Sequence, residues 1–330
     1  MRISIETLTN KIRESRELKV SMVSHSIADA DFMASAIALS QYLHKSSLSI
    51  PDKVSKKVEG ILETAGISYT TTNEIRDSDL IIMLDVNNFN GCGALADELK
   101  RTKKDIIIID HHAPNTSDSK NLFVFNDESF TSTTNIIYHI LKRLEVKIPE
   151  KIANLLLIGI VSDSAELRNS TPDTFMDIAE LLRIANTDYV KLANLLSYSI
   201  GPKEKLSAIN DISNAKKVLL KDKLLMYGEA NIPAHTVADM AIRIGADVSI
   251  FYSIYRDEVS VSARMLHPTD TAYNIHLGEI MRDLATMIEG TGGGHPCAAG
   301  AYGSKKEGIT VFINKFVDII TIKIKGQVSP

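Results

Sequence analysis

The sequence predicts an α/β protein: an N-terminal domain with a mostly parallel sheet flanked by helices, a helical linker, and a smaller α+β C-terminal domain. The first observation is a run of four isoleucines within residues 105–110, because such runs favour strands buried on both faces, as in parallel sheets. The second is the alternation of strand-like and helix-like segments before residue 200. The third is the change to short strand-like segments after residue 219. We place the N-terminal domain at residues 1–200, the helical linker at 201–218 and the C-terminal domain at 219–330.

Composition narrows the class of protein. At 330 residues the chain is long for a single core, and 44% hydrophobic and 24% charged residues are typical of a soluble globular protein. No apolar run approaches the ~20 residues of a membrane span, and the N-terminus lacks a signal-peptide core, so we expect a cytoplasmic protein without membrane association. Two cysteines are too few for a disulfide framework or a zinc cluster.

The charge distribution bears on partners. The net charge is −4, and no block rich in Lys and Arg stands out. A protein that follows a long nucleic acid along its phosphates usually carries a basic stripe. We therefore expect partners that are small, or that are held by local charge and bound metal.

The elements of the N-terminal domain follow from apolar periodicity and from breaker residues. Residues 5–17 form an amphipathic helix, and Gly66 is a suitable terminator for the helix that precedes it. Pro149 suits the first turn of a helix. The remaining predictions are strands at 19–24, 48–51, 67–70, 79–86, 105–112 and 122–125, and helices at 32–43, 53–65, 92–100, 132–144 and 149–162, with two more within 172–199.

The C-terminal part starts with a helix from Pro202 to about Val218. Strands are predicted at 224–227, 248–255 and 258–263, and residues 256–257 form a tight turn between the last two.

Polar residues follow three of the predicted parallel strands. His25, Asp29 and Asp31 follow the first strand, Asp85 ends another, and the isoleucine strand ends in Asp110-His111-His112. Open α/β sheets bind their ligands at the carboxyl ends of the strands. Simpler explanations are a polar strand end for the last group and helix caps for the aspartates near the first strand and for Asp85. Asp163, at the end of a helix, is weak evidence by itself.

Together these side chains have the composition of a metal site. Two divalent ions ~3.5–4 Å apart can bind both the attacking and the leaving oxygen of a phosphoryl displacement. Carboxylates alone suit magnesium, and the added imidazoles shift the preference toward manganese, cobalt or zinc, with manganese the best compromise.

The C-terminal domain holds two candidate binding features. Arg264 lies in or just after a strand, where an arginine is usually on the surface or in a salt bridge. Residues 291–300 read Thr-Gly-Gly-Gly-His-Pro-Cys-Ala-Ala-Gly, and three glycines before a histidine allow the backbone to approach an anionic ligand closely. The alternative is a flexible loop.

In order along the chain, these motifs resemble those of the DHH phosphoesterase superfamily. The N-terminal residues that carry the resemblance are His25, Asp29, Asp31, Asp85, Asp110, His111, His112 and Asp163. Gly292-Gly293-Gly294-His295, with Ser262-Ala263-Arg264 upstream, is similar to the DHH-associated C-terminal domain. The combination resembles the NrnA/RecJ-like branch of the superfamily rather than its inorganic pyrophosphatases.

The resemblance implies a role for each position. One metal is held by His25, Asp29 and Asp85, and the other by Asp31, Asp85, His111 and Asp163, so Asp85 bridges. Asp110 supports the site, and His112 faces the substrate phosphate as a donor. Arg264, Gly292, Gly293, Gly294 and His295 grip the terminal phosphate of the substrate across an interdomain cleft.

Two motifs depart from the family pattern. Where the family often has Pro-Asp-Gly-Asp-Ala, this chain has Ala-Asp-Ala-Asp-Phe at residues 28–32. Where the fourth motif commonly reads Asp-Thr-Gly and an aromatic residue, residues 163–167 read Asp-Ser-Ala-Glu-Leu. The carboxylates are retained, so these changes bear on substrate preference more than on activity.

We therefore expect a phosphodiesterase that hydrolyses very short oligonucleotides, such as linear dinucleotides, to mononucleotides. Water activated by two divalent ions, manganese before magnesium or cobalt, attacks the phosphorus in line. Within the enzyme class the alternatives are a cyclic-dinucleotide phosphodiesterase, a 3′,5′-bisphosphonucleotide phosphatase and a RecJ-like single-strand exonuclease. From another class, the alternative is a catalytically dead nucleotide-binding module. A homodimer is compatible with this reading, and no protein partner is identified.

Overall fold

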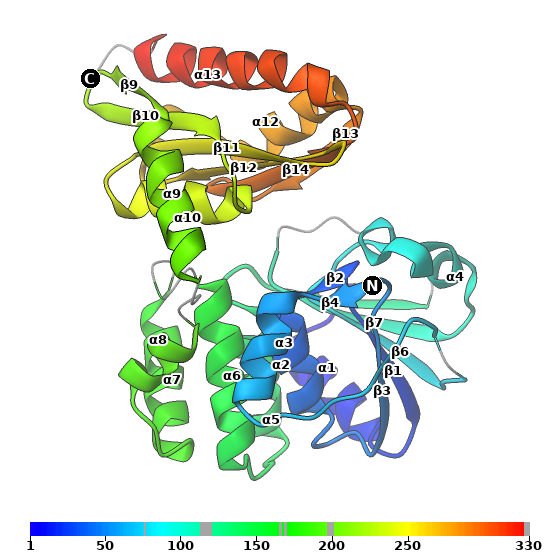
Figure 1. The fold of residues 1–330 in the computed structure, drawn as a ribbon. Helices are drawn as coiled ribbons and strands as arrows, with labels where there is room; N and C mark the ends of the chain where they lie inside the picture. Colours follow the sequence, from blue (N-terminus) through cyan, green and yellow to red (C-terminus); the bar gives the residue numbers. More distant parts are fainter. Residues whose placement is uncertain (76, 113–120, 165–166, 168–169, 197–200, 327–330) are drawn as a thin grey trace. The chain divides into compact units, whose positions relative to one another are not determined.

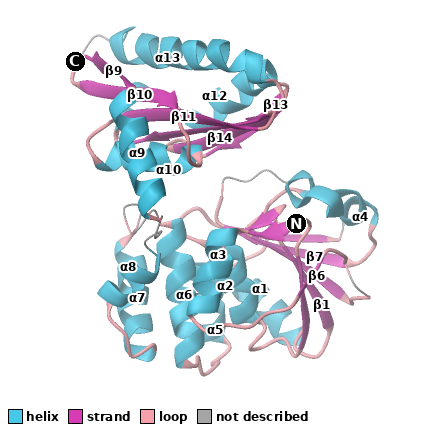
Figure 2. Cartoon of the chain, viewed as in Figure 1, coloured by secondary structure: helices cyan, strands magenta, loops and turns pink. Residues whose placement is uncertain are grey.

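The computed structural model describes residues 1–75, 77–112, 121–164, 167, 170–196 and 201–326. The chain divides into two compact units, Met1–Tyr198 (unit 1) and Ser199–Pro330 (unit 2). Each unit is built on its own six-stranded sheet with helices against it (Figures 1 and 2). Pro114 follows the isoleucine strand in the sequence and lacks the amide hydrogen that would extend it, but it lies outside the described residues.

The sheet of unit 1 is parallel throughout, as the sequence predicted. Its spatial order is β5-β3-β1-β6-β7-β8. The first strand, β1, and the fourth, β6, therefore lie side by side, and the chain proceeds outward from them in both directions. In an open α/β sheet, the carboxyl ends of the strands at such a reversal border the ligand-binding crevice. The strands are β1 (Lys19–Val23), β3 (Lys45–Ser49), β5 (Thr71–Thr72), β6 (Leu80–Leu84), β7 (Asp105–Asp110) and β8 (Leu122–Asn126), and β2 (Ile27–Ala28) pairs separately with β4 (Lys53–Val54).

The isoleucines of β7 show why this sheet is buried on both faces. Ile106 and Ile108 belong to an apolar cluster with Leu95 and Leu99 from the segment that contains α4. Ile107, on the opposite face, belongs to the larger cluster that holds the helices of the other layer. Figure 1 shows α4 on one side of the sheet and α1, α2, α3, α5 and α6 on the other. The helices of unit 1 are α1 (Ile5–Glu14), α2 (Ala30–Leu39), α3 (Lys56–Thr64), α4 (Ala96–Arg101), α5 (Thr133–Arg143), α6 (Glu150–Asp163), α7 (Pro172–Ile184) and α8 (Tyr189–Leu196).

Unit 2 has a mixed sheet in the order β13-β14-β12-β11-β10-β9. One apolar cluster, which includes Phe312 and Phe316 of α13, covers one face, and a second, which includes Val237 of α10, covers the other. The strands are β9 (Lys216–Leu220), β10 (Lys223–Glu229), β11 (Val248–Tyr255), β12 (Glu258–Met265), β13 (Gly290–Gly294) and β14 (Ala298–Gly303), and the helices are α9 (Pro202–Asn214), α10 (Ala234–Arg243), α11 (Thr269–Tyr273), α12 (Leu277–Leu284) and α13 (Ile309–Gly326).

Several predicted elements differ from the observed ones. The helix from Pro202 to Val218 ends at Asn214, because residues 216–220 pair with β10 as an antiparallel strand. The strand expected at 67–70 lies at 71–72 instead, where it pairs with β3. The helix expected at 92–100 is interrupted by Gly93, whose φ of 51° is not helical, so a 3₁₀ segment (Phe89–Leu95) precedes α4.

The glycine run is a strand rather than a loop. Gly290–Gly294 pairs antiparallel with β14, and α12 packs closely against it. A β-carbon at Gly292 would collide with the carbonyl of Met281 in α12. The absence of side chains therefore permits a close helix–strand contact, which sequence patterns based on side-chain alternation do not reveal.

Among the described residues, no helix is both long and apolar enough to cross a membrane.

A glycine in α6 tests how tightly the helical layer of unit 1 packs. A β-carbon at Gly159 would overlap the hydroxyl of Thr134 in α5 and lie 2.7 Å from the β-carbon of Ala34 in α2. We expect Gly159→Ala to lower the free energy of unfolding by about 1–3 kcal/mol, as overpacking does. Chemical denaturation measures this change.

Gly60 in α3 provides the matched control, because a β-carbon there meets nothing within 4 Å. Gly60→Ala should raise the free energy of unfolding by about 0.5–1 kcal/mol, the ordinary helix-propensity gain. Equal stabilisation by both substitutions would contradict the close packing of α6.

Candidate metal centre

Three neighbouring strands deliver the predicted residues to one edge of the sheet in unit 1. β6 pairs in parallel with both β1 and β7, so the carboxyl ends of all three lie together. His25 follows β1 by two residues, Asp85 follows β6 directly, and Asp110 is the last residue of β7. Asp163 joins them from the last residue of α6.

Asp85 lies at the centre of the group. Its Oδ2 is 3.9 Å from Nε2 of His25, while its Oδ1 is 3.7 Å from Nε2 of His111 and 3.6 Å from Nδ1 of His112. The two oxygens of this carboxylate therefore face two different sets of side chains. The backbone of Asp85 is left-handed, with φ of 58°, a conformation that Asp and Asn adopt more readily than most residues.

The first set is completed by Asp29. Its Oδ2 is 3.7 Å from Nε2 of His25, and its Oδ1 accepts a hydrogen bond of 3.0 Å from the amide of Phe32, capping α2. The capping explanation for this residue is thus correct, and it leaves the second oxygen directed at His25.

The second set surrounds His111. Its Nε2 is 3.1 Å from Oδ2 of Asp163 and 3.9 Å from Oδ2 of Asp31. Asp31 is almost fully buried and accepts hydrogen bonds of 2.7 Å from the amides of both Thr133 and Thr134 at the start of α5. A carboxylate at a helix N-terminus is stabilised by those amides and by the helix dipole, so the orientation of Asp31 is fixed.

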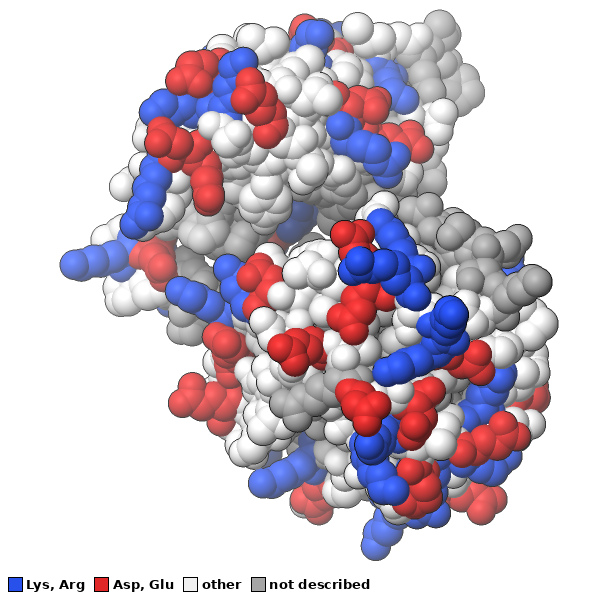
Figure 3. All heavy atoms as spheres, turned by 90° about the vertical axis from the view of Figure 1, so that its right-hand side faces the viewer, with Lys and Arg blue, Asp and Glu red and all other residues white. Residues whose placement is uncertain are grey.

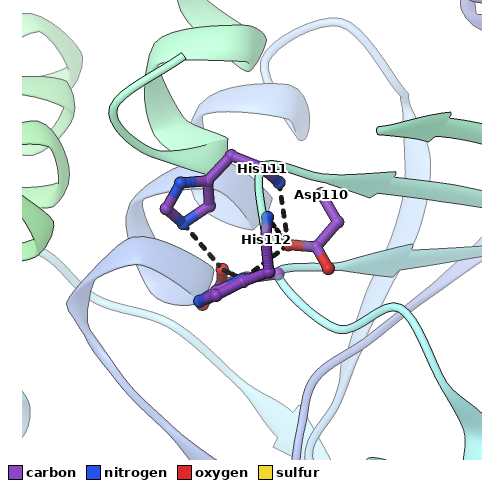
Figure 4. A group of neighbouring side chains, drawn as sticks. Asp110, His111 and His112 are labelled. Carbon is purple, nitrogen blue, oxygen red and sulfur yellow. Dashed lines mark hydrogen bonds and ion pairs between the residues drawn. The ribbon is translucent and has the colours of Figure 1, made fainter. Parts of the chain in front are cut away.

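Asp110 organises the two histidines that follow it. Its Oδ1 accepts hydrogen bonds from the amides of His111, at 2.8 Å, and His112, at 3.2 Å (Figure 4). The same oxygen lies 2.7 Å from Nδ1 of His112. Asp110 therefore fixes both the local backbone and the ring of His112, and it directs the Nε2 edge of that ring away from its own carboxylate.

Excess negative charge shifts the pKa values in this group. Burial, and then the charge of Asp163, raise the pKa of Asp31 to about 7. Burial and the neighbouring carboxylates Asp31, Asp29, Asp163 and Asp110 also raise the pKa of Asp85. Although burial alone would lower the pKa of His111, the bond to Asp163 and the carboxylates around it raise that pKa to about 9. The side chains thus favour bound protons or another cation.

The donors fit divalent metal ions. Within the described residues of unit 1, three groups have potential ligand atoms all within 4.8 Å of one another: His25, Asp29 and Asp85; Asp31, His111 and Asp163; and Asp85, Asp110, His111 and His112. Within the described part of the chain, the buried Oδ2 of Asp110 has no hydrogen-bond partner, and the buried Nε2 of His111 has its nearest carboxylate, that of Asp163, at 3.1 Å. Carboxylate oxygens mixed with imidazole nitrogens suit manganese, and the absence of sulfur ligands here argues against a structural zinc site.

Some residues that shape the site were not predicted from the sequence. Thr133 begins a predicted helix, where a hydroxyl usually serves as a cap, but its hydroxyl donates to Oδ1 of Asp85 at 3.3 Å. Thr134 donates its amide to Asp31, and Asn126 at the end of β8 donates to the carbonyl of His112 at 2.6 Å. A hydroxyl-rich helix start after a strand is the available signal, although it is also the ordinary signature of a cap.

The altered fourth motif is only partly described. Ser164, after Asp163, is buried, and its hydroxyl donates to the carbonyl of Val161 and accepts from the amide of Leu167, both at 3.1 Å. Its role here is to turn the chain after α6. Ala165 and Glu166 lie outside the described residues.

In unit 2, Arg264 is a half-buried strand residue held by its neighbours. Its Nε is 2.7 Å from Oδ1 of Asp239, and its Nη1 donates to the hydroxyl of Ser262 at 2.9 Å and to the carbonyl of Ala263 at 3.0 Å. The salt-bridge explanation for this arginine therefore holds. The same contacts fix the direction of the guanidinium.

The three glycines of the motif have different surroundings. Gly292 lies against α12, and a β-carbon at Gly294, whose φ is 134°, would lie 2.6 Å from the carbonyl oxygen of Ala298. At Gly293 a β-carbon would meet nothing within 4 Å. Packing thus explains two of the glycines, and Gly293 is the position with room for a ligand. His295 follows in the β13–β14 turn, where its amide donates to the carbonyl of Ala298.

Comparison with known proteins gives one family match in each of the two units. The family model described as "DHH family, N-terminal domain" matches residues 19–160, and that of the DHHA1 domain matches residues 227–321. The uncharacterized protein MJ0988 of Methanocaldococcus jannaschii is 26% identical over 289 residues, which cover 86% of each chain.

Two further proteins are similar to parts of the chain or to its fold. A protein of Streptococcus equi subsp. zooepidemicus (strain H70), described as a probable manganese-dependent inorganic pyrophosphatase, is 26% identical over 185 residues, which span 52% of this chain and 58% of that protein. The crystal structure of an exopolyphosphatase-related protein from Bacteroides fragilis superposes with a TM-score of 0.76 at 16% identity, covering 97% of both chains, which shows a shared fold.

The ordered motifs, the parallel sheet that brings them together and the two matching family models lead to one conclusion: the chain belongs to the DHH superfamily of phosphoesterases and carries a DHH domain followed by a DHHA1 domain.

Proposed function

We propose that the protein is a phosphodiesterase that uses two divalent metal ions, manganese by preference, to hydrolyse very short oligonucleotides such as linear dinucleotides to mononucleotides. The observation that carries this proposal is the position of Asp85. One of its oxygens faces His25, and the other faces His111 and His112, as a carboxylate shared by two ions would.

Some groups at this site would bind the metal ions, and others position those ligands. His25, Asp29 and Asp85 would hold one ion, and Asp31, Asp85, His111 and Asp163 the other. When bound, such ions lower the pKa of water and neutralise charge that develops on the phosphoryl oxygens. Asp31 is held by the amides of α5, so it is already in position before a ligand arrives. That preorganisation reduces the entropic cost of assembling the site.

His112 is the residue proposed to contact the phosphate. Asp110 accepts from Nδ1 of its ring, so Nε2 lies on the ring edge that does not face this carboxylate, and we propose that Nε2 contacts a substrate oxygen. We assign His112 to phosphate binding and protonation, and Asp110 to positioning it.

Surface charge supports short substrates over long ones. On the face drawn in Figure 3, Lys and Arg side chains are interspersed with Asp and Glu, and no continuous basic stripe runs over the described residues in view. Binding to a long strand depends on many phosphate contacts. For a short substrate a few charges suffice, and we propose that Arg264, Gly293 and His295 hold its terminal phosphate.

Pyrophosphate hydrolysis is a second candidate. It is favoured by the similarity, over half of this chain, to the streptococcal protein described as a manganese-dependent pyrophosphatase. Both reactions use the same metal chemistry, so only the substrate distinguishes them.

A substrate panel tests the proposed function. Purified full-length protein with Mn²⁺ is incubated with RNA and DNA of two to ten nucleotides, cyclic dinucleotides, 3′,5′-bisphosphonucleotides and pyrophosphate, and initial rates are compared. We expect linear dinucleotides to react fastest and the rate to fall with length. Fastest turnover of pyrophosphate would support the second candidate, and absence of any hydrolysis would support a binding module.

Asp85→Asn tests the two-metal arrangement, because Asn tolerates the left-handed backbone at this position whereas Ala would add strain. The pKa of Asp85 in the folded wild-type protein is raised, so its ionised form lowers the free energy of unfolding of the metal-free protein near neutral pH. The neutral amide of Asn removes that destabilisation. We expect the variant to melt at a higher temperature than the wild type without metal. With saturating Mn²⁺ the wild type should have the higher melting temperature, and the rate of hydrolysis by the variant should be lower than that of the wild type by ~100-fold or more.

Thermal melts with and without Mn²⁺ provide the measurement. Asp97→Asn is the matched control, because Asp97 is an exposed residue of α4 whose closest charged partner is Lys100 at 4.0 Å. That variant should behave as the wild type in both conditions. A similar Mn²⁺-induced rise in melting temperature for Asp85→Asn and the wild type would refute a central role for Asp85.

Substitutions in unit 2 test the terminal-phosphate site. Arg264→Ala should raise KM by about 10- to 100-fold for substrates with a terminal phosphate, because a charge-assisted hydrogen bond is lost. Gly293→Ala should raise KM as well, by occupying the open space, without lowering the melting temperature. Gly292→Ala, which collides with α12, should instead lower the melting temperature. Unchanged KM in the first two variants would remove unit 2 from substrate binding.

A further inference from the structure

A second group of potential metal ligands lies in unit 2, and none of its members has a role in the site proposed above. His267, Asp270 and Cys297 each offer one ligand atom, and these atoms are all within 4.8 Å of one another. His267 follows β12, Asp270 is in the first turn of α11, and Cys297 lies in the β13–β14 turn. The end of β12 lies beside that turn because Arg264 pairs with Ala298 of β14 and the amide of Met265 donates to the carbonyl of Cys297 at 2.9 Å.

The contacts within the group indicate whether Cys297 is suited to act as a nucleophile or as a metal ligand. Nδ1 of His267 is 2.9 Å from Oδ1 of Asp270, and the thiol of Cys297 also contacts Asp270. A nucleophilic cysteine needs a neighbouring base or cation that favours the thiolate. Here burial and the carboxylate of Asp270 raise the pKa of the thiol to about 12, which is the opposite of activation. The arrangement is therefore unsuited to a cysteine nucleophile.

A bound divalent cation would favour the thiolate form of Cys297. A bound metal deprotonates a coordinating thiol outright, and thiolate, carboxylate and neutral imidazole together neutralise an ion of charge +2. Ligand atoms about 2.0–2.3 Å from a tetrahedral zinc ion lie roughly 3.3–3.8 Å from each other, so atoms that all lie within 4.8 Å of one another need to shift by about 1 Å.

We propose that His267, Asp270 and Cys297 form a separate binding site for a thiophilic divalent metal, zinc by preference, with a fourth position open to water or another ligand. The sulfur ligand sets the preference, because thiolate selects zinc, whereas the carboxylate-rich group in unit 1 suits manganese. The count of cysteines in the sequence argued only against clusters built from several thiols.

The location gives such a site a structural consequence. Arg264 lies three residues before His267, and His295 two residues before Cys297. An ion bound here would tie the end of β12 to the β13–β14 turn and reduce the motion of both segments.

Cobalt provides a direct test, because Co²⁺ bound to a thiolate shows an intense charge-transfer absorption that carboxylate and imidazole ligands do not produce. Metal-stripped full-length protein is titrated with Co²⁺, and Zn²⁺ is then added. We expect the thiolate band to appear and then to disappear as Zn²⁺ displaces Co²⁺. Absence of the band in the wild-type protein would overturn the proposal.

Variants identify the ligands. The band should be lost in Cys297→Ser and retained in Cys92→Ser, which removes the other cysteine of the chain. It should also be retained in Asp85→Asn, because the unit 1 site is separate. His267→Gln changes an exposed side chain, so folding should be unaffected while more Co²⁺ is needed to reach the same absorbance. A band that persists in Cys297→Ser, or that is lost in Cys92→Ser, would refute the assignment.

Discussion

The mutual repulsion of buried carboxylates at one edge of the unit 1 sheet is the constraint on which the site depends. Asp31, Asp85 and Asp110 are nearly inaccessible to solvent, and two of them have raised pKa values. Burying ionised groups without compensation is costly, so such a cluster persists only where other groups or ions offset it. The amides of α5 and the hydrogen bonds within Asp110-His111-His112 supply part of that compensation, and bound cations would supply more.

The architecture of unit 1 makes this concentration of charge achievable. The sheet is covered on both faces by apolar clusters, so its interior is rigid and its polar residues are confined to the strand ends. Close packing among α2, α5 and α6, which leaves no room for a β-carbon at Gly159, holds the start of α5 beside Asp31. Stability contributed by the apolar layers thus offsets the destabilising chemistry at the edge.

Unit 2 uses close backbone packing for a different purpose. Two of its three motif glycines permit contact with α12 and β14, which fixes the strand that carries the third. Arg264 is oriented on the neighbouring part of the sheet by Asp239 and Ser262. The residues proposed to bind substrate are therefore placed on paired strands, which hold their geometry better than a loop would.

The sequence alone predicted the parallel sheet of unit 1, since four consecutive isoleucines favour a strand buried on both faces, and it identified the polar groups at the strand ends. Strand order, the two-sided position of Asp85 and the support from Thr133 arise from contacts between distant segments, which local patterns do not encode. The same reason explains the corrected elements: β9 forms because β10 is there to pair with it, and the glycine run is a strand because α12 packs on it. Only the fold also brings Cys297 beside Asp270, residues that nothing in the linear spacing connects.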